Sequence, residues 1–237
     1  MTDQTTALIT GASSGIGLAT AKLLLKQGYR VIGVSRRDNS ADLDHQYYQS
    51  LSIDLSRLDQ LESALKKLLQ TESIDCLINA AGQGHFGSIE QFSVQQIEAS
   101  LRLNLSSVMV VCRSLLPPMR HRGRGQMIFI GSESALNAGS KGALYSAAKF
   151  GLRGFSQALR ADCASDGIRV SLINPGMVRS PFFADLSFAP GADAENAIEV
   201  DDIADTIWQI LRSSSNIVID EINLSPRVKS IAFNKNK

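Results

Sequence analysis

Residues 7–28 constrain the fold of this 237-residue chain more than any other stretch. A short apolar run, 7–10, meets a turn with glycine at positions 11, 15 and 17, and an amphipathic segment, 18–27, ends at Gly28. This order predicts a strand, a glycine loop and a helix. Glycines let a ligand approach the backbone, and a helix N-terminus offers free N–H groups and about half a positive charge. The stretch therefore predicts a diphosphate cradle, although its spacing is not the common G-x-G-x-x-G.

Two arginines follow the second expected strand, residues 30–35. In a doubly wound fold, Arg36 and Arg37 would stand where the chain contacts the adenosine ribose of a dinucleotide, about 20 residues beyond the glycine loop. An acidic residue there would bind a 2′-hydroxyl, whereas a guanidinium suits a 2′-phosphate. A solvated basic pair is the alternative. After a glycine loop we favour a site for NADP(H), with Arg36 as the first choice.

Strand patterns continue to alternate with helical patterns along the chain. Further strands are expected at 47–53, 75–78, 126–130, 168–173 and 217–222. Helices are expected at 58–69, at 94–119 with a break near Asn104, and at 201–211, and another helix carries Tyr145 and Lys149 and ends at about 165. This alternation predicts an α/β fold: a doubly wound, mainly parallel seven-stranded sheet with helices on both faces, in a single domain over 1–237. Residues 38–46 leave room for a brief helix at most. Residues 180–200 show no clear period, which indicates a mobile segment.

Tyr145 and Lys149 form the main candidate for chemistry. They are four residues apart in an expected helix, so both side chains leave the same face. An ammonium favours the phenolate, so Lys149 would lower the pKa of Tyr145 from its ordinary value of about 10. Ser132, at the end of a strand, could complete a site that holds a carbonyl oxygen while Tyr145 gives or takes its proton. Such a Tyr–Lys pair is by itself more often a surface pair.

Asn104 lies within an otherwise apolar run, so its amide is expected to be either a structural hydrogen-bonding group or part of a site. The small residues Asn79, Ala80, Ala81 and Gly82 follow a strand, as a cofactor lying across the sheet would require. Histidines His45, His85 and His121 are interpreted as solvated.

Charge and composition exclude several classes of protein. Lys and Arg total 24 against 23 Asp and Glu, which leaves no electrostatic footprint for nucleic acid or an anionic membrane. No uninterrupted apolar run approaches the ~20 residues of a membrane span, and no signal-peptide pattern begins the chain. The three cysteines are odd in number and widely spaced, which indicates buried free thiols in the cytoplasm and neither disulfides nor a metal site.

Taken together, these motifs resemble the short-chain dehydrogenase/reductase family over nearly the whole chain. Residues 10–17 resemble the family's cofactor loop, 79–82 its strand motif, and 175–178 the segment that contacts the nicotinamide. The catalytic set of the family is matched in order and spacing by Asn104, Ser132, Tyr145 and Lys149.

The resemblance implies a role for each matched residue. Tyr145 would be the general acid/base, Ser132 would polarise the substrate oxygen, Lys149 would lower the tyrosine pKa and hold the nicotinamide ribose, and Asn104 would support a water in a proton relay. The expected cofactor contacts are Gly11, Ser13, Ser14, Gly15, Ile16, Gly17, Arg36, Arg37, Asp54, Leu55, Asn79, Ala80, Ala81, Gly82, Tyr145, Lys149, Pro175, Gly176, Val178 and Ser180.

The expected function is transfer of a hydride between NADP(H) and a small carbonyl or alcohol. The alternative is a non-catalytic NADP(H)-binding sensor on the same fold, which would not need the proton chemistry of the Tyr145 set. The substrate pocket is expected from residues 82–90, 135–142 and 180–200. Gly151 and Gly154 weaken an expected helix by up to ~1 kcal/mol each, which suggests close approach of another element and a homodimer or homotetramer.

Overall fold

The computed structural model describes residues 4–38 and 43–233. Its centre is a seven-stranded sheet in the order β10-β6-β5-β4-β1-β2-β3, and all of its described pairings are parallel. The strands are β1 (Thr6–Thr10), β2 (Arg30–Ser35), β3 (Tyr48–Ser52), β4 (Cys76–Asn79), β5 (Gly125–Ile130), β6 (Ile168–Pro175) and β10 (Glu221–Leu224). The predicted doubly wound parallel sheet is confirmed.

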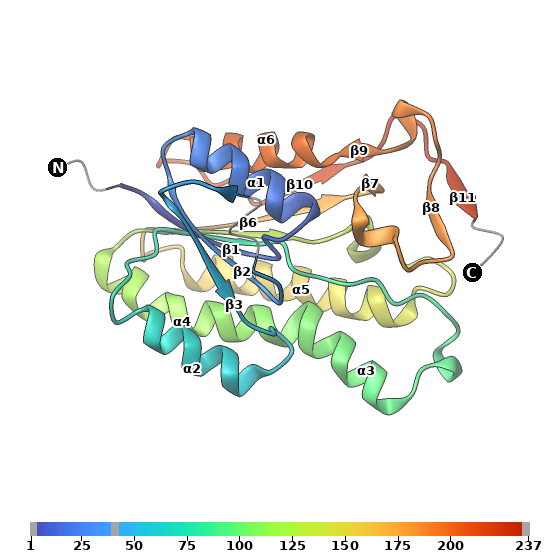
Figure 1. Cartoon of the computed structure of the whole chain (residues 1–237), viewed down its shortest axis with the longest axis horizontal. Helices are drawn as coiled ribbons and strands as arrows, with labels where there is room; N and C mark the ends of the chain where they lie inside the picture. The colour runs from blue at the N-terminus through green and yellow to red at the C-terminus, as the bar shows by residue number, and fades with distance from the viewer. Residues whose placement is uncertain (1–3, 39–42, 234–237) are drawn as a thin grey trace.

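Helices cover both faces of the sheet (Figure 1). On one face α1 (Gly15–Lys26) packs against α6 (Val200–Leu211), and on the other α2 (Leu58–Leu68) packs against α4 (Ser107–Arg122). Also on the second face, α5 (Ala143–Asp162) lies beside α3 (Val94–Leu101). The expected break near Asn104 is a π-helical segment, Arg102–Ser106, which joins α3 to α4.

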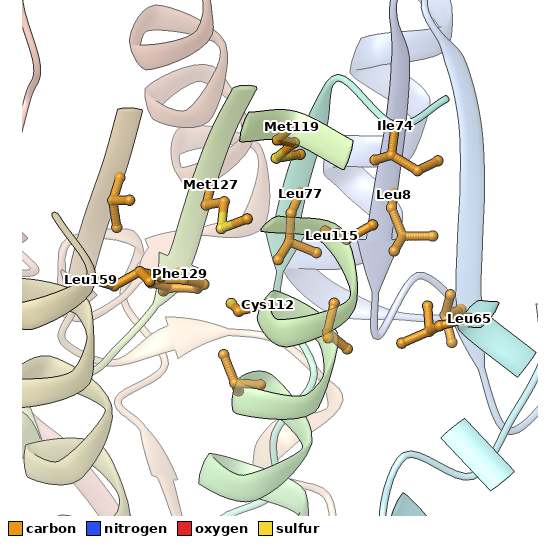
Figure 2. Packing of buried hydrophobic residues seen from close by; sticks show 14 of the residues in the cluster. Leu8, Leu65, Ile74, Leu77, Cys112, Leu115, Met119, Met127, Phe129 and Leu159 are labelled. Atoms are coloured by element: carbon orange, nitrogen blue, oxygen red, sulfur yellow. The ribbon is translucent and has the colours of Figure 1, made fainter. Parts of the chain in front are cut away.

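The main core lies between the sheet and the second layer of helices, as Figure 2 shows. Phe129 and Met127 of β5 meet Leu115 and Met119 of α4, and all four side chains are fully buried. Cys112 belongs to the same cluster. It and the other two cysteines, all in the described chain, are buried and free of disulfides, as expected from their spacing.

The helical run Val94–Arg122 is, by length and composition alone, long and apolar enough to cross a membrane. The sequence does not indicate this from apolar runs alone, because no uninterrupted apolar stretch within the helical run is long enough. In the structure its apolar side chains Val108, Val111 and Leu115 are buried in the core. One side of the run therefore packs in the core, while other apolar residues of it, such as Val94 and Met109, are exposed.

Other boundaries differ from expectation near the C-terminus. The last strand of the sheet is β10 at 221–224, not 217–222, because its register is set by pairing with β6 from Leu172 to Pro175. Between residues 178 and 200 lie β7 (Val178–Arg179), β8 (Phe188–Pro190), β9 (Ile198–Glu199) and two short 3₁₀ helices. A strand that was not expected, β11 (Ile231–Phe233), pairs with β8. The mobility of residues 180–200 stays a prediction, and the expected brief helix at 38–46 lies partly outside the described residues.

The two glycines of α5 have different surroundings. A Cβ added at Gly151 would lie 2.9 Å from Leu105 of the π-helical segment, so close packing within the chain accounts for this glycine. A Cβ added at Gly154 would have no described atom within 4 Å. Nothing within the described chain therefore explains the second glycine.

Candidate active site

The candidate site lies at the edge of the sheet where the parallel strands end. There β1 sits between β4 and β2, so the chain crosses to opposite sides of β1, and ligands of doubly wound sheets bind at such a point. The short strands β7, β8, β9 and β11 gather at the same end of the molecule (Figure 1). The sheet therefore brings the glycine loop, the end of β5 and the 178–200 segment together.

The glycine loop is shaped by close backbone contacts. Gly11 has φ +73°, and an added Cβ would lie 2.8 Å from the backbone of Ala81. An added Cβ at Gly17 would overlap the carbonyl oxygen of Gly11. Ser14 precedes α1, and within the described residues no side chain caps the helix and no acidic residue lies in its first turn. The N-terminus of α1 is therefore available to an anion.

The end of β4 is tied to the end of β1 by side-chain hydrogen bonds. The Thr10 hydroxyl donates to Asn79 Oδ1 at 2.9 Å and accepts from the Ala81 N–H at 3.3 Å. Asn79 is buried, while Ala80 and Ala81 are half-buried and Gly82 is exposed. This network places the predicted 79–82 contacts beside the glycine loop.

Arg36 and Arg37 leave the end of β2 in different directions. Arg37 Nη2 donates to the Ser13 carbonyl in the glycine loop at 3.5 Å. Hydrogen bonds from Ser56 hold the pKa of Asp54 below its ordinary value, and the positive charge of Arg36 contributes. Arg37 thus reaches the glycine loop, and Arg36 is near enough to the predicted cofactor contact Asp54 to affect its pKa. Leu55, the other predicted contact there, belongs to the core. Both arginines are exposed.

Ser180, which follows β6 and β7 in the chain, lies next to Gly15 of the glycine loop. A Cβ added at Gly15, where φ is +53°, would lie 3.5 Å from Ser180 Cβ. The Gly176 N–H donates to the Leu224 carbonyl at 2.7 Å, which fixes the turn after Pro175, and Val178 is buried. Ile16 is half-buried in the first turn of α1.

Tyr145, Ser132 and Lys149 come together between β5 and α5. Tyr145 is 6 % exposed and hydrogen-bonds to the Ser132 hydroxyl, which also accepts from the Ser134 N–H at 3.1 Å. Lys149, 4 % exposed, donates from Nζ to the Ile130 carbonyl at 2.9 Å and lies 5.7 Å from the centroid of the Tyr145 ring. The pair is not the surface pair that the spacing alone would suggest.

The expected lowering of the Tyr145 pKa is wrong in direction. Burial raises the pKa of Tyr145 to about 12, and the hydrogen bond with Ser132 opposes this rise only in part. Burial also lowers the pKa of Lys149 to about 8. Both side chains are buried where a charge is poorly solvated, so each pKa shifts toward the neutral form, although a Lys149 pKa of about 8 still leaves the ammonium charged at pH 7.

Asn104 lies in the π-helical segment with its side chain buried and engaged. Its Nδ2 donates to the carbonyls of Gln83 and Ser100 at 3.0 Å, and its Oδ1 accepts from the Gln83 N–H at 3.0 Å. A Cβ added at Gly82 would lie 3.0 Å from Asn104 Oδ1 and 3.7 Å from Lys149 Nζ. Asn104 therefore fixes the loop after β4 directly beside Lys149.

A set of phenylalanines around Tyr145 was not found from the sequence. We call Phe86, Phe182, Phe183 and Phe188 the aromatic cluster. Its ring centroids lie 5.2 Å (Phe86) and 5.8 Å (Phe182) from that of Tyr145. All four fall within the ranges expected to form the substrate pocket. The only sequence signal is the density of phenylalanine between 182 and 188, which shows no strand or helix period.

His85 is not the solvated residue that was expected. Its side chain is half-buried against the edge of Phe92, and burial lowers its pKa. Its buried Nδ1 has no hydrogen-bond partner among the described residues.

Comparison with known proteins agrees with this geometry. Residues 5–189 match the family model of the short chain dehydrogenases. An uncharacterized oxidoreductase of Staphylococcus saprophyticus is 29% identical over 230 residues, which cover 93% of this chain and 96% of the relative. A 3-oxoacyl-[acyl-carrier-protein] reductase of Buchnera aphidicola is 34% identical over 183 residues, 75% of each chain.

Solved structures show the same architecture. A metagenomic short-chain oxidoreductase in complex with NADP has a TM-score of 0.80 at 29% identity, over 95% of this chain and 98% of the other. The closed form of a serine dehydrogenase complexed with NADP+ has a TM-score of 0.80 at 22% identity, over 92% of this chain and 93% of the other. The family match, the fold and the arrangement of the site agree, and the chain belongs to the short-chain dehydrogenase/reductase family.

Proposed function

We propose that this chain is an NADP(H)-dependent oxidoreductase that transfers a hydride between its cofactor and a small-molecule carbonyl or alcohol, with Tyr145 as the general acid/base. The observation that carries the proposal is the convergence of Tyr145, Ser132 and Lys149 beside a glycine loop at the sheet edge. A non-catalytic sensor would not require a hydroxyl pair and a buried ammonium at one point.

The residues present fit a nicotinamide dinucleotide. The uncapped N-terminus of α1 suits the diphosphate, and Gly15 and Ser180 would lie on either side of it. Arg36 and Arg37 at the end of β2 suit a 2′-phosphate. The NADP complex of the metagenomic relative supports the same cofactor here.

The bound cofactor would supply or accept the hydride. Tyr145 holds its proton at neutral pH, where even an ordinary tyrosine with a pKa of about 10 is protonated, and burial raises its pKa further to about 12. A protonated phenol is the form that can donate to a carbonyl oxygen during reduction. The Ser132 hydroxyl, held by the Ser134 N–H, would bind the same oxygen. Lys149, beside Gly82, would bind the nicotinamide ribose.

Asn104 would act through its backbone. Because both ends of its side-chain amide are engaged with Gln83 and Ser100, its carbonyl oxygen is the group we assign to a water in the proton relay. Its side chain would position the loop that carries Gly82.

We also propose a homodimer or homotetramer that forms through α5, in the cytoplasm. Phe150 and Gly154 are four residues apart on α5, so they share a face, and Phe150 is 43% exposed. An exposed aromatic ring next to a glycine that nothing in the described chain covers is typical of a helix that packs against a second copy. The three buried thiols fit a reducing compartment.

Gly154→Phe should convert the assembly to monomers, because the ring would occupy the space that the partner helix requires. Light scattering at micromolar concentration measures the mass. Lys22→Phe, on the opposite face of the sheet, controls for an added exposed ring. A monomer mass for the unmutated protein would contradict the proposed assembly.

Tyr145→Phe should lower kcat at least ~10²-fold with almost unchanged affinity for NADPH, because only the proton donor is lost. NADPH oxidation on a panel of aldehydes and ketones measures turnover, and fluorescence titration measures cofactor binding. Tyr29→Phe, which keeps the ring that packs against Trp208, should leave both unchanged. NADPH binding without turnover of any substrate by the unmutated protein would favour the sensor.

Arg36→Ala should raise KM for NADPH about tenfold or more and leave that for NADH little changed, since hydrogen bonds to a charged phosphate contribute about 1.5–3 kcal/mol. Arg37→Ala is the matched comparison, and the variant with the larger rise identifies the guanidinium that binds the 2′-phosphate. Equal use of NADH and NADPH by the unmutated enzyme would contradict the choice of NADP(H).

Lys149→Met should abolish activity while raising the stability of the fold at pH 7. The pKa of Lys149 falls from 10.5 to about 8 on folding, so the cost of burying its charge is fully present below pH 8 and is relieved as pH rises toward 10.5. At about 1.4 kcal/mol per pH unit, this cost is on the order of 3 kcal/mol.

Urea denaturation of the unmutated protein and of Lys149→Met between pH 7 and pH 10 tests whether the stability difference changes with pH in this direction. The difference in free energy of unfolding should favour the Met variant most at pH 7 and shrink toward pH 10. Lys26→Met, at an exposed position of α1, should show no such change. A difference that does not vary with pH would rule out a lowered pKa at Lys149.

A further inference from the structure

We infer that the substrate is a neutral carbonyl compound with a flat aromatic group next to the carbonyl, and that the aromatic cluster binds this group. The inference rests on the proposed function and names the substrate class of the same site. It is carried by the rings that cover Tyr145 and by the charges that surround them.

The rings of the cluster approach Tyr145 from two separate segments. Phe86 belongs to the loop after β4, whereas Phe182, Phe183 and Phe188 belong to the segment after β7. The segments meet edge-on, with the centroids of Phe86 and Phe188 4.9 Å apart at 86°. Within the second segment, Phe183 lies 5.1 Å from Phe182 and 5.8 Å from Phe188. A substrate bound at Tyr145 would therefore lie against these rings.

The close packing of Phe86 and Phe182 depends on a glycine at position 84. A Cβ added at Gly84 would lie 2.7 Å from ring atoms of both Phe86 and Phe182, so glycine here lets both rings pack onto the backbone. On the other side, a Cβ added at Gly142 would lie 3.7 Å from the ring of Phe86. The two segments and the loop before α5 thus enclose the Tyr145 ring.

The charged groups around the cluster do not favour an anionic substrate. Glu133 follows Ser132 in the chain, and its carboxylate is paired with Lys229 at 2.6 Å. Arg179 is bound by Glu199 and by the carbonyls of Gly191 and Asp193. Lys141 is exposed, and its backbone carbonyl accepts from the Gly87 N–H in the loop that carries Phe86. Asp185, which lies between Phe183 and Phe188 in the chain, is negatively charged and would repel a carboxylate.

The energetics then favour a flat ring over an aliphatic group of equal size. Opening the cluster breaks edge-to-face contacts such as that between Phe86 and Phe188, and an aromatic substrate re-forms equivalent contacts with the separated rings. An aliphatic ring supplies the apolar area but lacks the aromatic quadrupole. Each ring contact contributes about three- to tenfold in affinity beyond burial of area.

A matched series of ketones tests the inference in the full-length protein with NADPH. Acetophenone and cyclohexyl methyl ketone share one carbon skeleton and differ in the aromaticity of the ring, which in acetophenone is also conjugated with the carbonyl. 4-Acetylbenzoate adds a carboxylate to the aromatic ring. We expect kcat/KM to be at least about fivefold higher for acetophenone than for either of the others. Equal or higher values for cyclohexyl methyl ketone or for 4-acetylbenzoate would overturn the inference and leave the proposed function intact.

Phe182→Leu links the preference to the cluster. This variant should reduce the ratio of kcat/KM for acetophenone to kcat/KM for cyclohexyl methyl ketone several-fold, mainly by raising KM for acetophenone. Phe155→Leu is the matched control, since Phe155 packs against Phe129 on the core side of α5 and should leave the ratio unchanged even if stability falls. An equal change in both variants, or no change in either, would overturn the role of the cluster.

A binding measurement separates this inference from the proposed function. Calorimetric titration of Tyr145→Phe with acetophenone in the presence of NADP+ does not depend on turnover. Preferential binding of acetophenone over cyclohexyl methyl ketone, without turnover of any ketone by the unmutated protein, would refute the proposed function and support the aromatic site. No preference in binding would refute the aromatic site.

Discussion

The site depends on one hydrogen bond across the boundary between sheet and helix. Lys149 Nζ donates to the carbonyl of Ile130, the last residue of β5, and so fixes α5 against the sheet edge within reach of Ser132. Because this ammonium is almost fully buried, the fold must tolerate a poorly solvated charge at that point. The large core beneath it, which includes Phe129 and Leu115, supplies the apolar burial that offsets this cost.

The pKa values illustrate where local reasoning from sequence fails. A spacing of four residues correctly places Tyr145 and Lys149 on one side of α5, and from that spacing alone an ammonium should stabilise a phenolate. Desolvation depends on everything packed around the pair, including Phe86 and Phe182, which are remote in sequence. In the structure this desolvation outweighs the opposing hydrogen bond with Ser132 and raises the pKa of Tyr145.

The rest of the fold likewise divides into features set by local sequence signals and features set by contacts between residues that are remote in sequence. The alternation of strands and helices and the strand–loop–helix unit at residues 7–28 could be predicted because glycines and hydrophobic periods are local signals. The C-terminal strand at 221–224 could not, because Ile217 and Ile219 are as apolar as Ile222 and only pairing with β6 decides between them. The aromatic cluster and β11 are likewise defined by long-range contacts. The roles of the individual site residues stay predictions.

The π-helical segment at Arg102–Ser106 has a geometric consequence for the helices on either side of it. A π turn holds one more residue than an α turn, and each residue of an α-helix advances the side chains by about 100°. The segment therefore changes the angular phase of α3 relative to α4 at the point where Asn104 turns inward to bind both backbone groups of Gln83. The additional residue thus lets α3 turn one face toward α5 while α4, in the same helical run, turns a different face toward the core.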